Sequence, residues 1–320
     1  MVEISDLFEE TTRLQASDLL LTAGVSPMVR VHGNLRRLDY PPLSPDEVKR
    51  LVYTLLHEQQ RLAFEENKEL DFSLGVGVSH RYRVNVYYQK GCVAAAFRPI
   101  ANIIPKLKEL GLPPIAYDLS FLPQGLILVT GPTGHGKTTT MASMIDLINT
   151  NRCCHIIAIE DPIEYVHEHR NSVVDQRELG ADTHSFATAL KYCLRQDPDV
   201  IMVGEMRDLE TIEAALTAAE TGHLVLATLH TNDAVQTIDR IIDVFPERQQ
   251  QQVRVQLSLT LAAVISQRLI PKASGTGRAL AVEVLKNVYA SAALIREGKT
   301  HQLYSVIETG TKEGMTTMDA

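Results

Sequence analysis

GPTGHGKTTT, residues 131 to 140, is the stretch that decides the fold class of this chain. It matches G-x-x-x-x-G-K-[ST], a pattern whose glycines let backbone N–H groups surround phosphate oxygens. The apolar, β-rich run Leu126–Thr130 precedes it and a helix-like segment follows it, so that a helix N-terminus adds its attraction for anions. The pattern therefore predicts a nucleotide-binding loop in which Lys137 reaches the β- and γ-phosphates and Thr138 holds Mg²⁺. The loop residues expected to bind ATP are Gly131, Pro132, Thr133, Gly134, His135, Gly136, Lys137, Thr138 and Thr139.

From residue 115 onward, apolar strand-like runs alternate with helix-like segments. This alternation favours an α/β domain, residues 115–320, with a mainly parallel sheet covered by helices on both faces. Two helices are expected, at Leu209–Thr221 and at Pro246–Leu269, the second with a buried stripe of Val253, Leu257, Leu261, Val264 and Leu269. The expected buried strands are Leu126–Thr130, Ile156–Ile159, Val200–Val203, Leu224–Thr228 and Ala279–Leu285.

Residues 1–98 are expected to form a smaller α+β domain. Pro45–Asn67 has the apolar rhythm of a helix, and His80–Gln89 alternates so that Arg81 and Arg83 share one face of a strand. Residues 99–114 carry four prolines, which is typical of a linker, with a short helix at Lys106–Leu110.

Composition excludes several classes of protein. The 320 residues are 45% hydrophobic and 22% charged, which is ordinary for globular domains. The formal net charge of −8 gives no support for a nucleic-acid binder, because phosphate-backbone binding needs clustered Lys and Arg. No apolar run of membrane-spanning length, no signal peptide and no C-x-x-C spacing is present, so a cytoplasmic protein without membrane insertion is expected.

Polar clusters follow the other three central strands of the expected sheet. They are Glu160–Glu164, Gly204–Asp208 and Leu229–Asn232. Because ligands bind beyond the carboxyl ends of the strands in an open parallel sheet, these clusters and the phosphate-binding loop are expected at one edge.

These clusters could catalyse phosphoryl transfer. That reaction needs the phosphate charge to be neutralised, Mg²⁺ to be bound and a water molecule to be oriented. Glu205 is expected to hold Mg²⁺, directly or through water. Glu160, Asp161 and Glu164 offer carboxylates that could orient or deprotonate the water, and His230 could donate a hydrogen bond to the γ-phosphate. Structural roles stay open as alternatives: a turn for Asp161, a solvated helix start for Glu164, and a scaffold role for His230 or His223.

Several motifs together resemble the PilT-type pilus retraction ATPases, within the secretion ATPase superfamily. Besides GPTGHGKTT, they are IEDPIEYVH (159–167), LRQDPDVIMVGEMRD (194–208), GHLVLATLHTNDA (222–234), TIDRIIDVFP (237–246) and LIREGKTHQLYSVIETG (294–310), with SDLLLTAG near the start. The resemblance spans nearly the whole chain, and this set of motifs is far more specific than a lone phosphate-binding loop.

The resemblance implies a PAS-like N-terminal domain and a RecA-like P-loop NTPase core. It implies a homo-hexameric, Mg-ATP-hydrolysing motor that powers type IV pilus retraction and twitching motility. Glu164 would be the general base, Glu205 would assist at Mg²⁺, and His230 would couple nucleotide state to the ring. Arginines of a neighbouring subunit would complete the site, and the candidates here are Arg81, Arg83 and Arg98. The implied partner is the inner-membrane platform protein of the pilus machine, with the motor peripheral at the inner face of the cytoplasmic membrane.

The sequence departs from the family pattern in two places, and two alternative functions stay open. The proline and arginine that the family usually places before LIREGKT are replaced by Tyr289–Ala293, and the family normally continues with a further helical segment, so a C-terminally shortened chain is expected. The four-cysteine zinc motif of the extension ATPases is absent, which favours the retraction type. The alternative functions are a related secretion or DNA-translocating ATPase, and a nucleotide-gated assembly factor with little hydrolysis.

Overall fold

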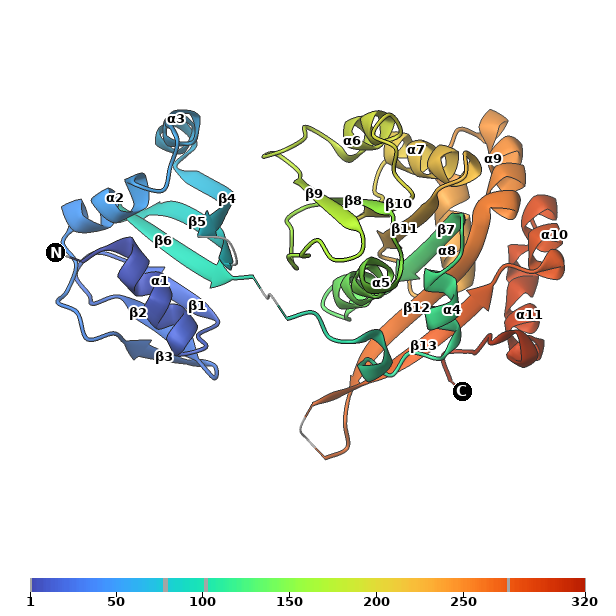
Figure 1. The fold of residues 1–320 in the computed structure, drawn as a ribbon, viewed down its shortest axis with the longest axis horizontal. Helices are drawn as coiled ribbons and strands as arrows, with labels where there is room; N and C mark the ends of the chain where they lie inside the picture. Colours follow the sequence, from blue (N-terminus) through green and yellow to red (C-terminus); the bar gives the residue numbers. More distant parts are fainter. Residues whose placement is uncertain (1, 77–79, 101–102, 275–276, 320) are drawn as a thin grey trace. The chain divides into compact units, whose positions relative to one another are not determined.

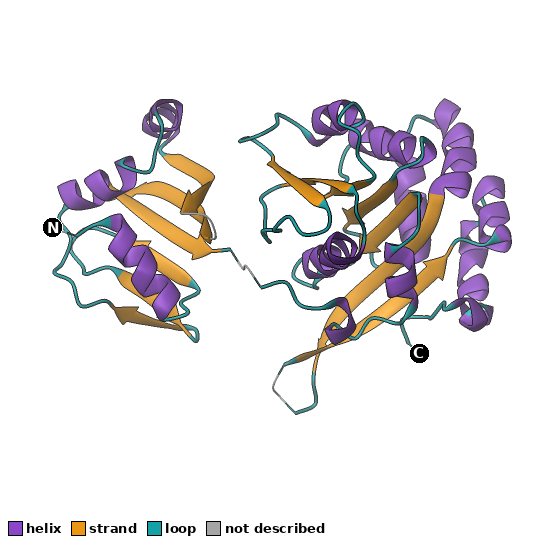
Figure 2. Ribbon diagram, viewed as in Figure 1, coloured by secondary structure: helices purple, strands orange, loops and turns teal. Residues whose placement is uncertain are grey.

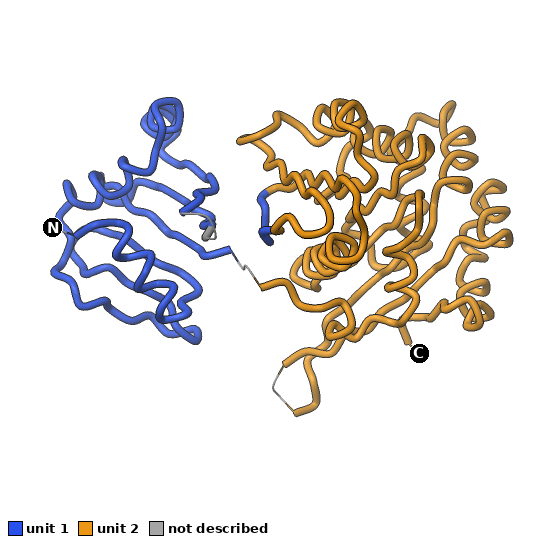
Figure 3. The backbone as a smooth tube through the Cα atoms, in the orientation of Figure 1, with its two compact units in different colours: residues 1–102, 162–166 blue, residues 103–161, 167–320 orange. Residues whose placement is uncertain are grey.

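The computed structural model describes residues 2–76, 80–100, 103–274 and 277–319. The chain divides into two compact units, residues 1–102 with 162–166 and residues 103–161 with 167–320 (Figure 3). No helix in these described ranges combines the length and the apolar character that crossing a membrane would require.

The first unit is an antiparallel sheet with helices (Figure 1). Its strand order is β3-β2-β1-β6-β5-β4. Three helices contribute Leu7, Phe8, Leu51, Val52 and Phe64 to one core with the buried face of the sheet. The elements are α1 (Ile4–Arg13), β1 (Asp18–Leu21), β2 (Met28–Val31), β3 (Asn34–Arg37), α2 (Pro45–Tyr53), α3 (Glu58–Asn67), β4 (Glu69–Val76), β5 (His80–Gln89) and β6 (Cys92–Pro99).

The expected single helix over Pro45–Asn67 is wrong, because the chain forms two helices there. Thr54 closes α2, and His57 begins α3 by accepting a hydrogen bond from the N–H of Gln60. The His57 N–H in turn donates to Oε1 of the Gln60 side chain, which completes a capping box. This local capping interrupts an apolar rhythm that continues across the break.

The second unit is a seven-stranded sheet with helices on both faces (Figure 2). Its strand order is β13-β12-β7-β11-β10-β8-β9; β12-β7-β11-β10-β8-β9 are parallel and β13 is antiparallel. The strands are β7 (Gly125–Thr130), β8 (His155–Glu160), β9 (Val173–Glu178), β10 (Val200–Val203), β11 (Leu224–Leu229), β12 (Leu261–Pro271) and β13 (Arg278–Lys286). The helices are η1 (Leu107–Glu109), α4 (Ile115–Ser120), α5 (Lys137–Asn151), α6 (Phe186–Cys193), α7 (Leu209–Glu220), α8 (Ala234–Asp243), α9 (Glu247–Thr260), α10 (Tyr289–Glu297), η2 (Thr300–Gln302), α11 (Leu303–Thr309) and η3 (Thr311–Glu313).

Alternate residues of the central strands enter two different cores. Leu126 and Leu128 of β7 pack with α6 to α11, whereas Ile127 and Val129 pack with α4 and α5. All six residues of β7 are buried. This two-sided burial is why the strand sequences are almost continuously apolar, and it confirms the expected α/β fold of this part.

The expected helix over Pro246–Leu269 is wrong in its second half. Helix α9 ends at Thr260, and Leu261 begins β12, which pairs with β7 on one side and β13 on the other. The apolar run 261–265 is buried on both faces as a strand, and its spacing also fits a helical stripe. Periodicity alone does not separate a fully buried strand from a buried helix, and β12 lies beside the strand that carries the phosphate-binding loop.

Candidate nucleotide site

The carboxyl ends of β7, β11, β10 and β8 lie side by side, as the parallel pairing of these strands requires. The phosphate-binding loop leaves β7, the His230 loop leaves β11, Glu205 follows β10 and Glu160 ends β8. Three of the four polar clusters therefore meet at one edge of the second unit, and the fourth begins there with Glu160.

The conformation of the phosphate-binding loop depends on a buried lysine and on a glycine. Lys137 is 8% exposed, and its Nζ donates to the carbonyl oxygens of Gly131 and Pro132 at 2.8 and 3.1 Å. Gly131 has φ +142°, and a Cβ there would lie 2.3 Å from the carbonyl oxygen of Gln267 on β12. The close approach of two backbones therefore requires glycine at this position.

Strand β12 supports the loop from the side, a role that the sequence prediction missed because it placed this segment in a helix. Gln267 Nε2 donates to the carbonyl oxygen of His135 at 3.0 Å. The Leu269 N–H donates to Nδ1 of the His135 ring at 3.0 Å, so this ring is fixed by the strand. Arg278 of β13 adds a bond to the carbonyl oxygen of Gly134 at 3.0 Å.

His230 joins the phosphate-binding loop to the cluster after β10. Its Nε2 lies 3.1 Å from Glu205 Oε1, and its Nδ1 lies 3.4 Å from Thr133 Oγ1. The carboxylate can only accept, so Nε2 carries a proton, and in the neutral tautomer Nδ1 accepts from the Thr133 hydroxyl. The structure thus brings together three of the residues predicted from the sequence, each from a different strand end.

Glu205 is held in its ionised form by its neighbours. Burial raises the pKa of this carboxyl, but the hydrogen bond from Arg207 Nε and the nearby His230 outweigh it, so the pKa is lowered. The Arg207 bond measures 2.5 Å. An ionised carboxylate beside the loop is what a magnesium-binding or water-binding role needs. Arg207 lies within the motif GEMRD, but only the structure reveals its contact with Glu205.

The acidic residues after β8 lie in different environments. Glu160 is 3% exposed and accepts a hydrogen bond from Gln176 Nε2 of β9 at 2.9 Å. Asp161 and Glu164 are exposed, and Glu164 lies in the segment 162–166 that belongs to the first unit. His223 lies at the start of β11, where its Nδ1 lies 2.9 Å from the Ala218 carbonyl oxygen, at the opposite end of the strand from His230.

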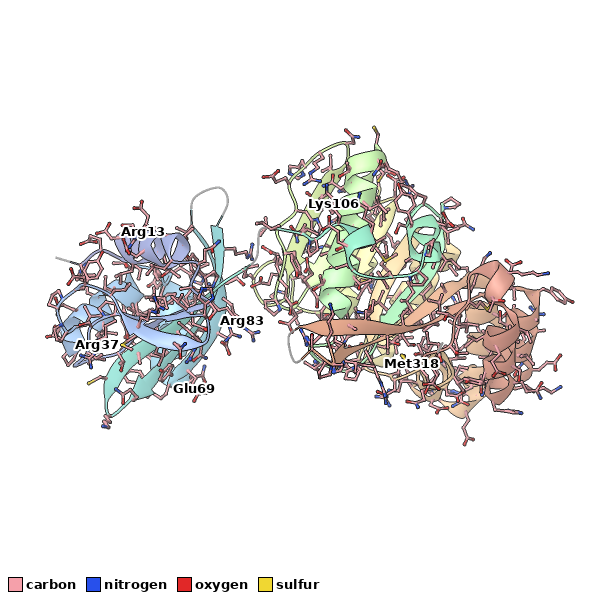
Figure 4. All side chains as sticks on the ribbon, turned by 90° about the horizontal axis from the view of Figure 1, so that it is seen from below. Arg13, Arg37, Glu69, Arg83, Lys106 and Met318 are labelled. Carbon is pink, nitrogen blue, oxygen red and sulfur yellow. The ribbon has the colours of Figure 1, made fainter. Side chains whose placement is uncertain are left out.

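The three arginine candidates gather on one face of the sheet of the first unit. Arg83 of β5 is directly opposite Arg98 of β6, and Arg81 lies two residues along the same strand. Arg83 is exposed at the surface of its unit (Figure 4). Arg98 is fixed by Asp18, whose Oδ1 accepts from its Nε and a terminal nitrogen at 3.0 and 2.9 Å.

Comparisons with known proteins point to one family. Residues 98–314 match the family model described as "Type II/IV secretion system protein". The chain is 49% identical over 318 residues to the "Type IV pilus retractation ATPase PilT" of Pseudomonas aeruginosa, covering 99% of this chain and 92% of that protein. It is 48% identical over 312 residues to the "Twitching motility protein" of Neisseria gonorrhoeae, covering 96% and 83%.

Solved structures agree with the sequence relatives. The structure titled "Crystal Structure of the Pilus Retraction Motor PilT and Bound ADP" superposes with a TM-score of 0.90 at 52% identity. The match covers 100% of this chain and 96% of that one. This similarity extends over both compact units.

Proposed function

The chain belongs to the type II/IV secretion system protein family, and from that premise we propose that it is the ATP-hydrolysing motor of type IV pilus retraction. It is an ATPase of the PilT type, as its full-length similarity to a pilus retraction ATPase and to an ADP-bound retraction motor indicates. The single observation that carries the mechanism is the contact of His230 with both Glu205 and Thr133. That contact joins the phosphate-binding loop to two further strand ends in one site.

The residues at this edge fit Mg²⁺ with ATP. Thr138 supplies a hydroxyl at the start of α5, and the ionised Glu205 supplies a carboxylate; both are the hard oxygen ligands that Mg²⁺ prefers. We infer that Thr138 holds the ion directly and Glu205 directly or through water. When bound, Mg²⁺ would neutralise charge on the β- and γ-phosphate oxygens.

The loop itself binds the phosphates. Its backbone N–H groups and the N-terminus of α5 provide donors for anionic oxygens, and residues 131–139 form this cradle. The Lys137 ammonium is already held at the loop by two carbonyl oxygens, so it can exchange these for phosphate oxygens without crossing apolar surface.

Glu164 is the general base in this proposal. Its carboxylate is exposed and lies only four residues after the last residue of β8, so it is available to accept a proton from the attacking water. Glu160 is unsuited to this role because it is buried and bound to Gln176. The Nε2–H of His230, which faces Glu205 in this structure, donates to the γ-phosphate when ATP is bound and returns to Glu205 when that phosphate has left.

The working assembly in this proposal is a homo-hexamer in which one subunit's arginines reach a neighbour's ATP. Arg81, Arg83 and Arg98 are suited to this because they share one face, where guanidinium groups can bind phosphate oxygens. The motor would act on the inner-membrane platform protein of the pilus machine, from the inner face of the cytoplasmic membrane.

A retraction assay in cells tests the function. A strain that assembles type IV pili but lacks its retraction ATPase is complemented with the wild-type chain or with Lys137→Ala, and single-pilus retraction is recorded. The proposal expects retraction with the wild type and none with Lys137→Ala. Retraction by Lys137→Ala at the wild-type rate, or none by a well-expressed wild type, would overturn it.

A further inference from the structure

Glu283 of β13 is a buried carboxylate that the site described above does not use. The residue is 4% exposed, and no ion pair to it is found in residues 2–76, 80–100, 103–274 and 277–319. Burial raises its pKa, and the nearby carboxylates of Asp233 and Asp319 raise it further, while the hydrogen bond from the Ala234 N–H lowers it. A buried acid without a cation costs stability, so its position needs a reason other than folding.

The Glu283 side chain fixes the beginning of α8. Its Oε1 accepts from the backbone N–H of Ala234, the first residue of that helix, at 2.8 Å. Asp233 caps the same helix by accepting from the Gln236 N–H at 2.8 Å. The first N–H groups of a helix have no partner within the helix, so both acids satisfy N–H groups at the start of α8, and Glu283 links this helix to β13.

The start of α8 is in turn tied to the loop that carries His230. Thr237 of α8 donates to the carbonyl oxygen of Asp233 at 2.6 Å, and its hydroxyl lies 2.7 Å from that of Thr231. Thr231 follows His230 directly. A displacement of the first turn of α8 would therefore move the His230 ring relative to Glu205 and Thr133.

Glu283 also lies in a buried polar row that crosses the sheet to the phosphate-binding loop. It is directly opposite Ser266 of β12, and Ser266 is directly opposite Thr130 of β7. The Ser266 and Thr130 hydroxyls are 2.8 Å apart, and both residues are fully buried. Thr130 immediately precedes Gly131, so Glu283 is in register with the last residue before the loop.

We propose that Glu283 is a positioning residue for the ATP site, holding the first turn of α8, and through Thr237 and Thr231 the His230 loop, in register with the phosphate-binding loop. This inference rests on the proposed function, because it assigns to His230 the contact with the γ-phosphate. ATP and ADP differ only by that phosphate. Loss of Glu283 therefore weakens hydrolysis and the preference for ATP, while the loop continues to bind the phosphates that ADP retains.

The test compares Glu283→Ala and Glu283→Gln with Glu313→Ala as the matched control. Glu313 also contacts β13, through an exposed ion pair with Lys286 at 2.8 Å, but it is not bound to α8. For each protein kcat and KM for ATP, the dissociation constant for a fluorescent ADP analogue and the thermal midpoint are measured.

Glu283→Ala is expected to lower kcat by about tenfold, the factor that accompanies the loss of one well-placed hydrogen bond, with an ADP dissociation constant within about twofold of wild type. The amide oxygen of Glu283→Gln can still accept from the Ala234 N–H, so the kcat of this variant is expected to be close to that of the wild type. Glu313→Ala should behave as wild type. If Glu283 only stabilised the fold, its loss would lower the thermal midpoint and would not lower kcat selectively while leaving ADP binding unchanged.

Three outcomes overturn the proposal: wild-type kcat in Glu283→Ala, a parallel loss of ADP binding and kcat, or no recovery in Glu283→Gln. If Glu283→Ala does not fold, Thr237→Val decides the matter, because it removes the hydroxyl link while keeping the side-chain shape. It should lower kcat and spare ADP binding, and unchanged turnover would refute the chain of contacts. An inactive wild type would refute the proposed function instead.

Discussion

The imidazole Nε2 of His230 lies 3.1 Å from Oε1 of Glu205, so the loop after β11 is bonded to the second residue after β10. The other ring nitrogen faces Thr133 of the phosphate-binding loop at 3.4 Å. In the proposed mechanism, a group held between the phosphate-binding loop and a carboxylate responds to the presence of the γ-phosphate. His230 is the residue at which the three strand ends are in contact.

His230→Ala is accordingly expected to lower kcat for ATP hydrolysis by roughly a hundredfold, the typical effect of removing one donor to a developing charge. KM should change less, since Lys137 and the loop amides remain. The control is His223→Ala, which removes a histidine from the opposite end of the same strand. Steady-state phosphate release measures both variants, and equal loss of kcat in the two would contradict a specific role for His230.

Gly131→Ala is expected to destabilise the second unit and abolish nucleotide binding. The new Cβ would lie 2.3 Å from the Gln267 carbonyl oxygen, at φ +142°. Strain and backbone displacement together should cost about 3 kcal/mol of unfolding free energy. Gly134→Ala shares the positive φ (+77°) but meets nothing within 4 Å, and should cost only about 1 kcal/mol. Chemical denaturation of both variants compares the two costs, and a smaller loss in Gly131→Ala would be contrary to this packing.

Stability should fall in mild acid because of His167. Burial lowers the pKa of this ring to about 4, from an ordinary value of 6.5, with a smaller effect of Arg170. The unfolded chain then binds a proton that the folded chain does not, so stability is full above about pH 6.5 and is lost as the pH falls towards 4. The loss attributable to this ring is about 3 kcal/mol.

The free energy of unfolding, measured at pH 7 and pH 4.5, tests this dependence. His167→Phe keeps an aromatic ring without a titrating group and should lose less stability between the two pH values than the wild type. His301→Phe replaces an exposed ring and serves as the control. A wild-type pH dependence in His167→Phe would assign the acid sensitivity to other groups.

Mixing an impaired variant with an inactive one tests whether the arginines act on a neighbour's ATP. Arg83→Ala should hydrolyse ATP at no more than about a tenth of the wild-type rate, because a transition-state charge loses its partner. Lys137→Ala should be inactive. In a mixed ring, a Lys137→Ala subunit offers its intact Arg83 to the intact loop of an Arg83→Ala neighbour, so activity should reappear on mixing. Arg37→Ala, on the edge strand β3 (Figure 4), is the control and should stay active. Arginines that act within their own subunit would give no recovery.

The central strands could be predicted from sequence because each is buried on both faces. Leu126–Thr130 and Val200–Val203 are almost wholly apolar, and the structure has strands at both places. The same reasoning failed for β12, since Leu261 and Val264 fit a helical stripe as well as a strand. Edge strand β3 was missed because Asn34–Arg37 is exposed throughout and carries no burial pattern.

The sequence indicates candidate site residues where a motif ends a strand, but it does not indicate the residues of a neighbouring strand that support them. His230 follows β11 directly and Glu205 lies two residues after the end of β10, and the parallel pairing of these strands brings them together. Gln267 contacts the phosphate-binding loop and Glu283 contacts the start of α8, and both positions follow from the pairing of β12 with β7 and β13. Non-local register of this kind cannot be derived from the order of residues in one chain.

Phosphate release from ATP by the purified wild-type chain and by Lys137→Ala, with and without Mg²⁺, tests the central claim most directly. In the proposed mechanism, hydrolysis at this edge of the sheet requires the loop lysine at the phosphates and Mg²⁺ held by Thr138 and Glu205. The account predicts Mg²⁺-dependent release by the wild type and a loss of at least about a hundredfold in Lys137→Ala. Equal release by the two proteins, or release that does not depend on Mg²⁺, would contradict it.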